Sequence, residues 1–401
     1  MRNLLAILSS RGFFGAERAN LEVLDLMQRA GLKVEVLVRH EPWKENLHLR
    51  AQLQQRSLRW HTARFPDYPS MAYPKYWLRV LFLLPFFLIA LNLRAFRVAH
   101  RQRSDVVLLN SVFSTICLLP WLWLSRLPSV FYVNSAPEQH NAFYRWAWKV
   151  LARRVNTFVG ESDYIAGTLR DVGVPELQIS VIRSQAPSRH QPQPCAWQRD
   201  EGDGLFVLGY VGQISVTKGL ELLIESFVLL HATWPAVRLA LAGPLDSVFA
   251  QQLKMRCEGL ACASAIFFHG AVEDIDGFFV QCDAHVALSL GSEAYGLVVI
   301  EAKQAGCPSV VLHRGGIAEL VLDGVDGFVV EEATPDAVTR QLLAYRDQPS
   351  LAAQQGREAR ASLMERLHTD RQAEYWRHVL ERVRASFPVP AKPHSGRKHD
   401  V

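Results

Sequence analysis

The stretch Ser292-Glu293-Ala294-Tyr295-Gly296-Leu297-Val298-Val299-Ile300-Glu301-Ala302 is the junction from which the fold of this chain can be worked out. The apolar run before it, residues 284–290, is typical of a strand buried in a parallel sheet. The pattern after it is helical and ends at Gly306, a residue type that commonly closes helices. We therefore expect Glu293 on the loop at the carboxyl end of a strand, and Glu301 about one turn inside the next helix.

The two carboxylates are expected to converge, because side chains on a helix lean back towards its N-terminus. Free N–H groups and the helix dipole favour an anion at that point. A ligand with a phosphate in the middle and hydroxyls at both ends, such as a nucleotide-sugar, fits these groups. The alternative is that Glu293 and Glu301 are two solvated side chains on a surface helix. Gly296, which lets a backbone approach a ligand closely, and the strand–loop–helix context favour the binding site.

The chain is long enough for two domains, with 401 residues of which 49% are hydrophobic and 21% charged. A polar, Pro/Gly-rich break over residues 184–204 divides it near its midpoint, and each half then begins with a strand, a glycine turn and a helix. Strands are expected at residues 4–8, 34–38, 106–109, 129–133, 157–159 and 179–182, and then at 206–211, 237–242, 266–268, 285–290 and 308–312. Strands that alternate with helices predict an α/β fold, a parallel sheet in each half, and a cleft between two Rossmann-like domains.

Positive charge is concentrated in residues 42–104, which contain eleven Lys or Arg and two acidic residues. This window has a net charge of +9, whereas the whole chain has a net charge of +5. The same window holds the apolar run 80–91, which Pro85 is expected to interrupt. This run is shorter than the roughly 20 residues that span a bilayer. A basic, aromatic-rich segment favours contact with the surface of an anionic membrane. The alternative is a buried helix with a solvated basic flank. Binding to nucleic acid is not favoured, because no recognition motif accompanies the charge.

The remaining sequence features exclude several classes of protein. Six cysteines include no CxxC pair and no zinc spacing, which predicts reduced, buried thiols in a cytosolic protein. The apolar run at residues 4–8 is too short for a signal peptide and is interpreted as the first strand. Neither glycine turn contains the full GxGxxG fingerprint, so a nicotinamide or flavin enzyme is rejected.

Several motifs together resemble family 4 of the retaining glycosyltransferases (glycosyl transferases group 1), which have the two-domain GT-B fold. The most specific is Glu293-(x)7-Glu301, followed by Gly315-Gly316-Ile317 and by Asp323-Gly324-Val325-Asp326-Gly327-Phe328-Val329. In the first half, Gly15-Ala16-Glu17-Arg18 resembles the family's GGAER turn, with Phe14 in place of the first glycine, and residues 178–182 match the strand that closes the first domain. The resemblance covers roughly residues 4–385.

The resemblance implies a role for each matched residue. Glu301 would accept hydrogen bonds from the ribose hydroxyls of the donor, and Glu293 would hold a hydroxyl of the donor sugar. Lys218 would neutralise the diphosphate as it leaves, and Gly15 would let the acceptor and the diphosphate approach the first domain. The donor-binding set that the resemblance implies is Gly15, Gly212, Gln213, Lys218, Glu293, Tyr295, Gly296, Leu297 and Glu301. No cofactor and no bound metal are expected, since fixed cations and N–H donors already stabilise the leaving group.

Two positions depart from the family pattern. Gln213 stands where the family has an arginine, five residues before Lys218, and glutamine carries no charge. Arg314 or Arg183 is the candidate replacement. Asn134 stands where many members have a histidine beside the donor sugar; it can hydrogen-bond a hydroxyl but cannot shuttle a proton, a task for which the nearby His140 is a candidate. The catalytic set is therefore Lys218, Glu293 and Asn134. The family's same-face attack, in which the leaving phosphate oxygen takes the acceptor's proton, needs no enzyme nucleophile.

The resemblance thus implies a retaining glycosyltransferase of the hexosyltransferase type. It would move a sugar from a UDP- or GDP-sugar to a glycan acceptor, lipid-linked, in cell-surface polysaccharide or lipopolysaccharide biosynthesis. The protein is expected to be cytoplasmic and peripheral on the cytoplasmic face of the membrane. The alternatives are a non-catalytic GT-B scaffold or regulatory protein, favoured by the two departures, and a nucleotide-sugar epimerase or a glycoside phosphorylase. An epimerase needs acid and base residues that the sequence does not place, and a phosphorylase is expected to need a pyridoxal lysine and a far longer chain.

The predicted domain boundaries follow from the same patterns. Residues 1–183 are expected to form one Rossmann-like domain, 184–204 a linker and 205–369 a second Rossmann-like domain. The resemblance implies that the first binds the acceptor and the second the nucleotide-sugar. Residues 370–386 form a helix that packs back on the first domain. The tail 387–401 is expected to be disordered.

Overall fold

A computed structural model describes residues 3–10, 15–40, 47–66, 77–137, 142–183, 204–366 and 369–385. Four sequence predictions fall wholly or mostly outside these described residues. They concern the first glycine turn, His140, the linker with Cys195, and the tail.

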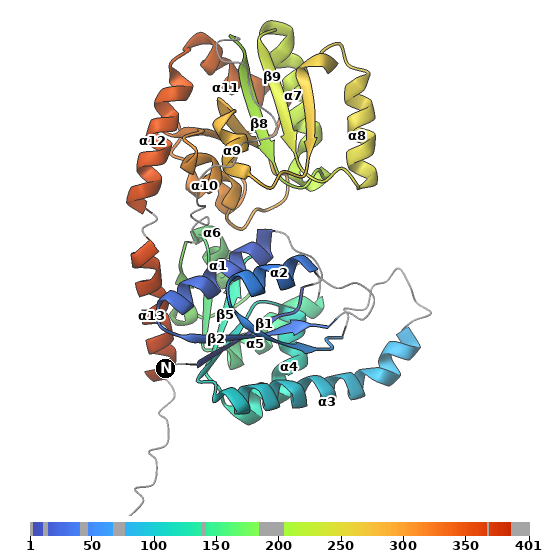
Figure 1. Ribbon diagram of the computed structural model, residues 1–401, viewed down its shortest axis with the longest axis vertical. Helices are drawn as coiled ribbons and strands as arrows, with labels where there is room; N and C mark the ends of the chain where they lie inside the picture. The colour runs from blue at the N-terminus through green and yellow to red at the C-terminus, as the bar shows by residue number, and fades with distance from the viewer. Residues whose placement is uncertain are drawn as a thin grey trace, which may run out of the picture.

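The first half of the chain folds into a seven-stranded parallel sheet in the order β3-β2-β1-β4-β5-β6-β7 (Figure 1). Its strands are β1 (Asn3–Leu8), β2 (Lys33–Arg39), β3 (Arg59–Ala63), β4 (Val106–Leu109), β5 (Ser129–Val133), β6 (Thr157–Gly160) and β7 (Ile179–Val181). Helices cover both faces of this sheet, so its central strands can be apolar throughout. β4, with the sequence Val-Val-Leu-Leu, is buried at every position.

The helices of the first domain form two layers with separate cores. On one face pack α3 (Trp77–Gln102), α4 (Val112–Ser125), α5 (Ala142–Arg154) and α6 (Asp163–Asp171). On the other face pack α1 (Gly15–Arg29), α2 (Leu47–Gln55) and α13 (Thr369–Ala385).

The second half of the chain builds a six-stranded parallel sheet in the order β10-β9-β8-β11-β12-β13. Its strands are β8 (Phe206–Val211), β9 (Val237–Ala242), β10 (Ile266–Gly270), β11 (Ala284–Ala287), β12 (Ser309–Leu312) and β13 (Gly327–Val330). On one face pack α7 (Leu220–Thr233), α8 (Val248–Glu258) and α11 (Pro335–Asp347), and on the other α9 (Ile275–Val280) and α10 (Leu297–Gln304). The predicted fold class, two Rossmann-like α/β domains, is confirmed.

The chain returns to its first domain at the end. α12 (Leu351–Arg366) packs against α10 beside the second sheet, and α13 then runs along the first domain (Figure 1). Trp376 of α13 is 1% exposed, and its ring meets the ring of Tyr132 on β5 edge to face, 5.9 Å between centroids. The first domain is thus completed by residues from the far end of the chain.

Four details differ from the sequence prediction, the first being β13 (Gly327–Val330), a strand that was not expected. β3 was not expected, because Arg59-Trp60-His61-Thr62-Ala63 has the mixed polarity of an edge strand and not of a central one. β11 ends at Ala287 and not at Leu290, so the loop that carries Glu293 begins earlier. Pro85 does not end a helix but lies within α3, and no described helix is both long and apolar enough to cross a membrane. The five cysteines among the described residues are free and buried, as predicted.

Candidate functional site

A cavity of about 460 Å³ lies between the carboxyl ends of the two sheets. Residues from both domains line it, as expected where the strands of open α/β sheets end. Every residue that the sequence assigned to the site lines this one cavity: Gly15, Asn134, Gly212, Gln213, Lys218, Glu293, Tyr295, Gly296, Leu297 and Glu301. The structure thus brings together side chains up to 286 positions apart, from Gly15 to Glu301; their individual roles stay predictions.

Glu301 is buried at the cavity wall, on the fifth residue of α10, with 2% of the residue exposed. Its carboxylate forms an ion pair with the guanidinium of Arg18, which comes from α1 of the other domain. The ion pair stabilises the buried carboxylate, which would be strongly destabilising without a partner. Arg18 thereby reaches across the cleft to the residue expected to hold a ribose.

Glu293 lies on the loop after β11, where the sequence placed it. Its Oε2 accepts hydrogen bonds from Lys218 Nζ at 2.6 Å and from Ser289 Oγ at 3.1 Å. Lys218 ends a short 3₁₀ turn, Val216–Lys218, in front of α7. The predicted sugar-binding carboxylate and the predicted diphosphate-binding ammonium are therefore partners of each other in this structure.

Two glycines shape the backbone of the site. Gly296 caps α10 with φ +99°, and a Cβ there would lie 2.7 Å from Ile317 Cγ1. Gly219 follows Lys218 with φ +70°, and a Cβ there would lie 1.9 Å from the Leu288 carbonyl oxygen. Both positions need left-handed backbone as well as the absence of a side chain, so glycine is required on geometric grounds. They place the first turn of α10 and the Lys218 turn at the cavity wall.

The first domain contributes a more open wall. Among the residues that the structure describes, none has an atom within 4 Å of a Cβ built on Gly15. Asn134, directly after β5, donates a hydrogen bond from Nδ2 to the Ala16 carbonyl oxygen at 3.2 Å. This bond holds the start of α1 against the end of β5. It uses the Nδ2 group of Asn134, and the side-chain oxygen is the atom that could accept a hydrogen bond from a ligand hydroxyl.

The turn after β8 is held by Tyr210. Its hydroxyl donates to the Gln213 carbonyl oxygen at 2.7 Å. The pKa of Tyr210 is raised, first by burial and then by the nearby charge of Glu293. The phenol therefore stays neutral and keeps its donor role. Gln213 itself is exposed at the cavity wall.

Neither of the two arginines expected to replace the family arginine lines the cavity. Arg314 donates to the Leu290 carbonyl oxygen at 3.1 Å, and Arg183 pairs with Asp163 at 2.5 Å; neither is among the described residues that line the cavity. The cations among those lining residues are Lys218 and Arg18. Sequence reasoning quoted Arg18 only as part of a motif. Its position three residues after Gly15, in the first turn of a helix that starts at the cleft, is the signal in the sequence that it lines the cavity.

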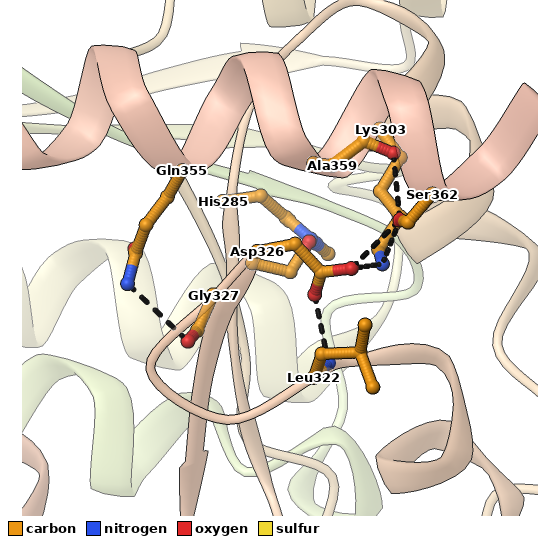
Figure 2. Close-up of polar contacts among 9 residues, drawn as sticks. His285, Lys303, Leu322, Asp326, Gly327, Gln355, Ala359 and Ser362 are labelled. Atoms are coloured by element: carbon orange, nitrogen blue, oxygen red, sulfur yellow. Dashed lines mark hydrogen bonds and ion pairs between the residues drawn. The ribbon is translucent and has the colours of Figure 1, made fainter.

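A buried ion pair fixes the helix that carries Glu301 (Figure 2). Lys303, two residues further along α10, donates from Nζ to Asp326 Oδ2 at 2.5 Å, and Ser362 Oγ of α12 donates to the same oxygen at 2.7 Å. The other carboxylate oxygen accepts from the Leu322 amide at 2.7 Å. The side chains of Lys303 and Asp326 are 4% and 0% exposed, so both charges depend on this arrangement.

The chain contains one Asp-x-Asp pair, Asp274 and Asp276, and because carboxylates are ligands for Mg²⁺, its position relative to the cavity bears on the expectation of a metal-free site. The pair starts α9, where Asp274 Oδ1 accepts from the Gly277 amide at 2.9 Å and caps the helix. Neither aspartate is among the described residues that line the cavity. Among the described residues, no group of three His, Cys, Asp or Glu side chains is placed to hold a metal ion.

Polar contacts also join the two domains beside the cavity. Ser162 Oγ donates to the Ala294 carbonyl oxygen at 2.6 Å. The carboxylate of Glu319 accepts from the amides of Asp163 and Tyr164, at 3.0 and 2.7 Å, and so caps α6 from the opposite domain. The loop that carries Glu293 and Tyr295 is thereby tied to the first domain.

Comparison with known proteins agrees with this architecture. The model of Glycosyltransferase Family 4 matches residues 14–184, and that of Glycosyl transferases group 1 matches residues 196–362. The lipopolysaccharide core biosynthesis mannosyltransferase LpcC of Rhizobium leguminosarum is 27% identical over 246 residues, 59% of this chain and 66% of that protein. The lipopolysaccharide 1,2-N-acetylglucosaminetransferase of Salmonella typhimurium is 29% identical over 144 residues, 34% of this chain and 38% of that protein. The matches therefore span less than two thirds of these relatives.

Solved structures share the fold over nearly the whole chain. HepE of Anabaena, crystallised with UDP and glucose, superposes with a TM-score of 0.76 at 17% identity and covers 95% of this chain and 100% of its own. Sucrose-phosphate synthase of Thermosynechococcus elongatus superposes with a TM-score of 0.73 at 16% identity, over 96% and 100% of the two chains. With two family models in succession and one fold throughout, the chain belongs to the GT-B glycosyltransferases of group 1 and family 4.

Proposed function

We propose that this protein is a retaining glycosyltransferase that moves a hexose from a UDP- or GDP-sugar to a glycan acceptor. The observation that carries the proposal is the pairing of two carboxylates, Glu293 and Glu301, with two cations, Lys218 and Arg18, around one cavity. A nucleoside diphosphate sugar offers a partner for all four groups. Hydroxyls of ribose and sugar suit the carboxylates, and the diphosphate suits the cations.

Donor binding then exchanges partners within the site. Glu301 turns from Arg18 to the ribose hydroxyls, and Glu293 turns from Lys218 to a sugar hydroxyl. The two cations are released to the diphosphate, where Arg18 supplies the positive charge that Gln213 lacks. Negative charge on the leaving diphosphate grows in the transition state, so these cations stabilise it more than the ground state and accelerate the transfer. The mechanism requires neither an enzyme nucleophile nor a metal ion.

The acceptor enters against the first domain, at Gly15 and Asn134. Its hydroxyl attacks the anomeric carbon from the face that the diphosphate leaves, and its proton passes to the leaving phosphate oxygen. The relatives support a cell-surface glycan as the product, since two of them act in lipopolysaccharide biosynthesis by name. HepE, crystallised with UDP-glucose, supports a nucleotide-sugar as the donor. We include in the proposal a lipid-linked acceptor at the cytoplasmic face of a membrane.

A thermal-shift screen against UDP, GDP, ADP, CMP and their sugar conjugates tests the donor. Stabilisation by one nucleoside diphosphate is expected in the wild type and should be lost in Glu301→Ala, because loss of hydrogen bonds to the ribose costs about 1–3 kcal/mol. Lys218→Ala should lower turnover more than donor affinity. Equal loss of both would reduce Lys218 to a binding residue, and no stabilisation by any nucleotide would contradict the proposal.

One observation favours a second candidate, a GT-B protein that binds a nucleotide-sugar without turnover. Gln213 and Asn134 replace a cation and a proton carrier, and either loss can abolish catalysis. The two candidates differ in a single readout. A donor that binds with the expected stabilisation, but is never consumed with a glycolipid extract as acceptor, would identify the non-catalytic protein.

A further inference from the structure

A second concave site lies at the opposite edge of the first sheet from the cleft. Its volume is about 480 Å³, and it is formed where β1, β2 and β3 begin and α3 ends. Its lining includes six cationic side chains and one carboxylate: Lys33, Arg59, Arg94, Arg97, Arg101, Arg103 and Glu35. We call these residues the arginine pocket.

The single carboxylate does not neutralise the arginines of the pocket. Glu35 accepts from Gln102 Nε2, contacts His61 Nε2 at 2.8 Å and lies 3.8 Å from Lys33 Nζ. Its oxygens are therefore already engaged at the base of the pocket. In the described part of the chain, the guanidinium groups of Arg59, Arg97, Arg101 and Arg103 make no hydrogen bond or ion pair, so the donors of these four groups are open to an anion in the pocket.

An apolar ridge leads along α3 to the pocket. Phe86, Ile89, Leu93 and Phe96 are 66%, 59%, 48% and 45% exposed, and their spacing of three or four residues puts them on one side of the helix. Arg97 follows Leu93, and Arg101 follows Arg97, by four residues each. Figure 1 shows α3 along the side of the first domain that faces away from the second domain. α4, which packs against α3, carries Trp123 and Leu124 in its last turn, where they are 59% and 78% exposed.

We propose that the arginine pocket binds the phosphate of an anionic phospholipid headgroup while the α3 ridge inserts among the acyl chains below it. Guanidinium groups suit phosphate oxygens because of their planar, bidentate geometry. A soluble phosphate would use the pocket but would leave the exposed Phe and Ile side chains in water, and this combination commits the site to a lipid. The inference deepens the membrane contact within the proposed function, and it places that contact where it leaves the cleft unobstructed.

Sedimentation with sucrose-loaded vesicles tests the pocket. The wild type should bind vesicles of phosphatidylglycerol mixed with phosphatidylcholine, and not vesicles of phosphatidylcholine alone. The variant Arg59→Gln/Arg97→Gln/Arg101→Gln should bind on the order of 100-fold more weakly, at about fivefold per basic residue held at an anionic surface. The matched control Arg340→Gln/Arg357→Gln/Arg360→Gln removes the same charge from exposed positions of α11 and α12. Its binding should stay within about threefold of wild type.

Equal loss in the two triple variants would overturn the proposal, because net charge alone would then explain binding. Undiminished binding of the pocket variant would overturn it as well. Ile89→Ser/Phe96→Ser should weaken vesicle binding roughly tenfold or more, and the control Val248→Ser/Met255→Ser should not. A wild type that is stabilised by glycerol 3-phosphate but binds no vesicle would assign the pocket to a soluble phosphate and exclude the lipid. Thermal shifts with UDP and GDP must be retained in the pocket variant, which separates this test from that of the proposed function.

Discussion

At the scale of single residues, the proposed function gives its sharpest test at Arg18, a cation of the cavity lining that the sequence did not assign to the site. Arg18→Gln should weaken binding of UDP or GDP roughly 10- to 100-fold, the value of a charge-assisted hydrogen bond, and should leave binding of the free nucleoside unchanged. Gln213→Arg in the same chain should restore most of the loss by supplying the charge from the other domain. Isothermal titration of UDP or GDP into the wild type, Arg18→Gln, Gln213→Arg and the double variant measures the loss and its recovery.

Arg314→Gln is the control for this cycle, since it removes the same charge from an exposed side chain outside the cavity lining. Equal weakening by Arg314→Gln would show a general field effect. A double variant no better than Arg18→Gln would contradict the idea that Arg18 substitutes for the missing arginine, and would leave it as the structural partner of Glu301.

The buried pair of Lys303 and Asp326 gives a second prediction, on stability. Lys303→Met should lower the free energy of unfolding by about 3–5 kcal/mol, because the carboxyl group of Asp326 would be buried without its main partner. Lys303→Met/Asp326→Asn should recover most of this loss, since two neutral side chains need no ion pair. Urea denaturation measures the cycle. If Lys303→Met is as stable as the wild type, water reaches the carboxylate of Asp326.

A third residue, His285, predicts part of the acid sensitivity. It is fully buried on β11 with Nδ1 3.0 Å from Ser309 Oγ, and burial lowers its pKa from 6.5 to about 3. Below pH 6.5 the unfolded chain binds a proton that the folded protein refuses, so stability falls with falling pH by up to about 1.4 kcal/mol per unit. Between pH 7 and pH 5 the loss should be about 2 kcal/mol smaller in His285→Asn. Urea titrations at the two pH values that give the same loss of stability for the wild type and His285→Asn would contradict this prediction.

Residue types and spacing were enough to find most of the cavity wall but not its ion pairs. Glu293 and Glu301 follow from one local pattern, since a strand, a loop and a helix place them together. Arg18 is 283 positions from Glu301, and a lysine such as Lys303 is normally expected at the surface. Pairing across such separations is decided by how the two domains dock and how α12 covers α10, which no local pattern encodes.

At the scale of elements, burial decided what could be predicted. β4, β5 and β12 are buried at every position and consist mostly of apolar residues, so composition identifies them. β3 lies at the sheet edge and includes Arg59 and His61, and its strand pattern is correspondingly weak. Pro85 lies in the ninth position of α3, where the chain lacks one N–H donor, yet the helix continues, stabilised by packing of its later turns on the sheet.

The last helix gives a prediction at this scale. Trp376 of α13 packs in the core of the first domain, against Tyr132, although the second domain precedes it in the chain. Trp376→Ala should destabilise the first domain by about 3–5 kcal/mol and leave the second nearly unchanged. Hydrogen exchange followed by mass spectrometry separates the two: protection should fall in β1 and β5 and persist in β8 and β12. Uniform loss would show that the two domains unfold as one unit.

At the scale of the whole molecule, the contacts beside the cavity set how the domains face each other. Glu319 accepts two amide hydrogen bonds from the start of α6, and Arg183 Nη2 lies 3.7 Å from the same carboxylate. Because each charge-assisted bond is worth about 1.5–3 kcal/mol, Glu319→Ala should shift the domain equilibrium more than tenfold towards open arrangements. Small-angle scattering of the ligand-free protein should then give a larger radius of gyration for the variant.

Nucleotide binding should reverse this change, because a diphosphate held by Lys218 on one side and Arg18 on the other bridges the same two domains. The control is Glu331→Ala, whose carboxylate pairs with His313 within the second domain and should leave the scattering unaltered. If Glu319→Ala scatters like the wild type without nucleotide, the Ser162–Ala294 contact and the Arg18–Glu301 pair suffice to hold the domains. If UDP or GDP at saturation leaves the variant open, Arg18 does not reach the diphosphate, and the partner exchange proposed for the site fails with it.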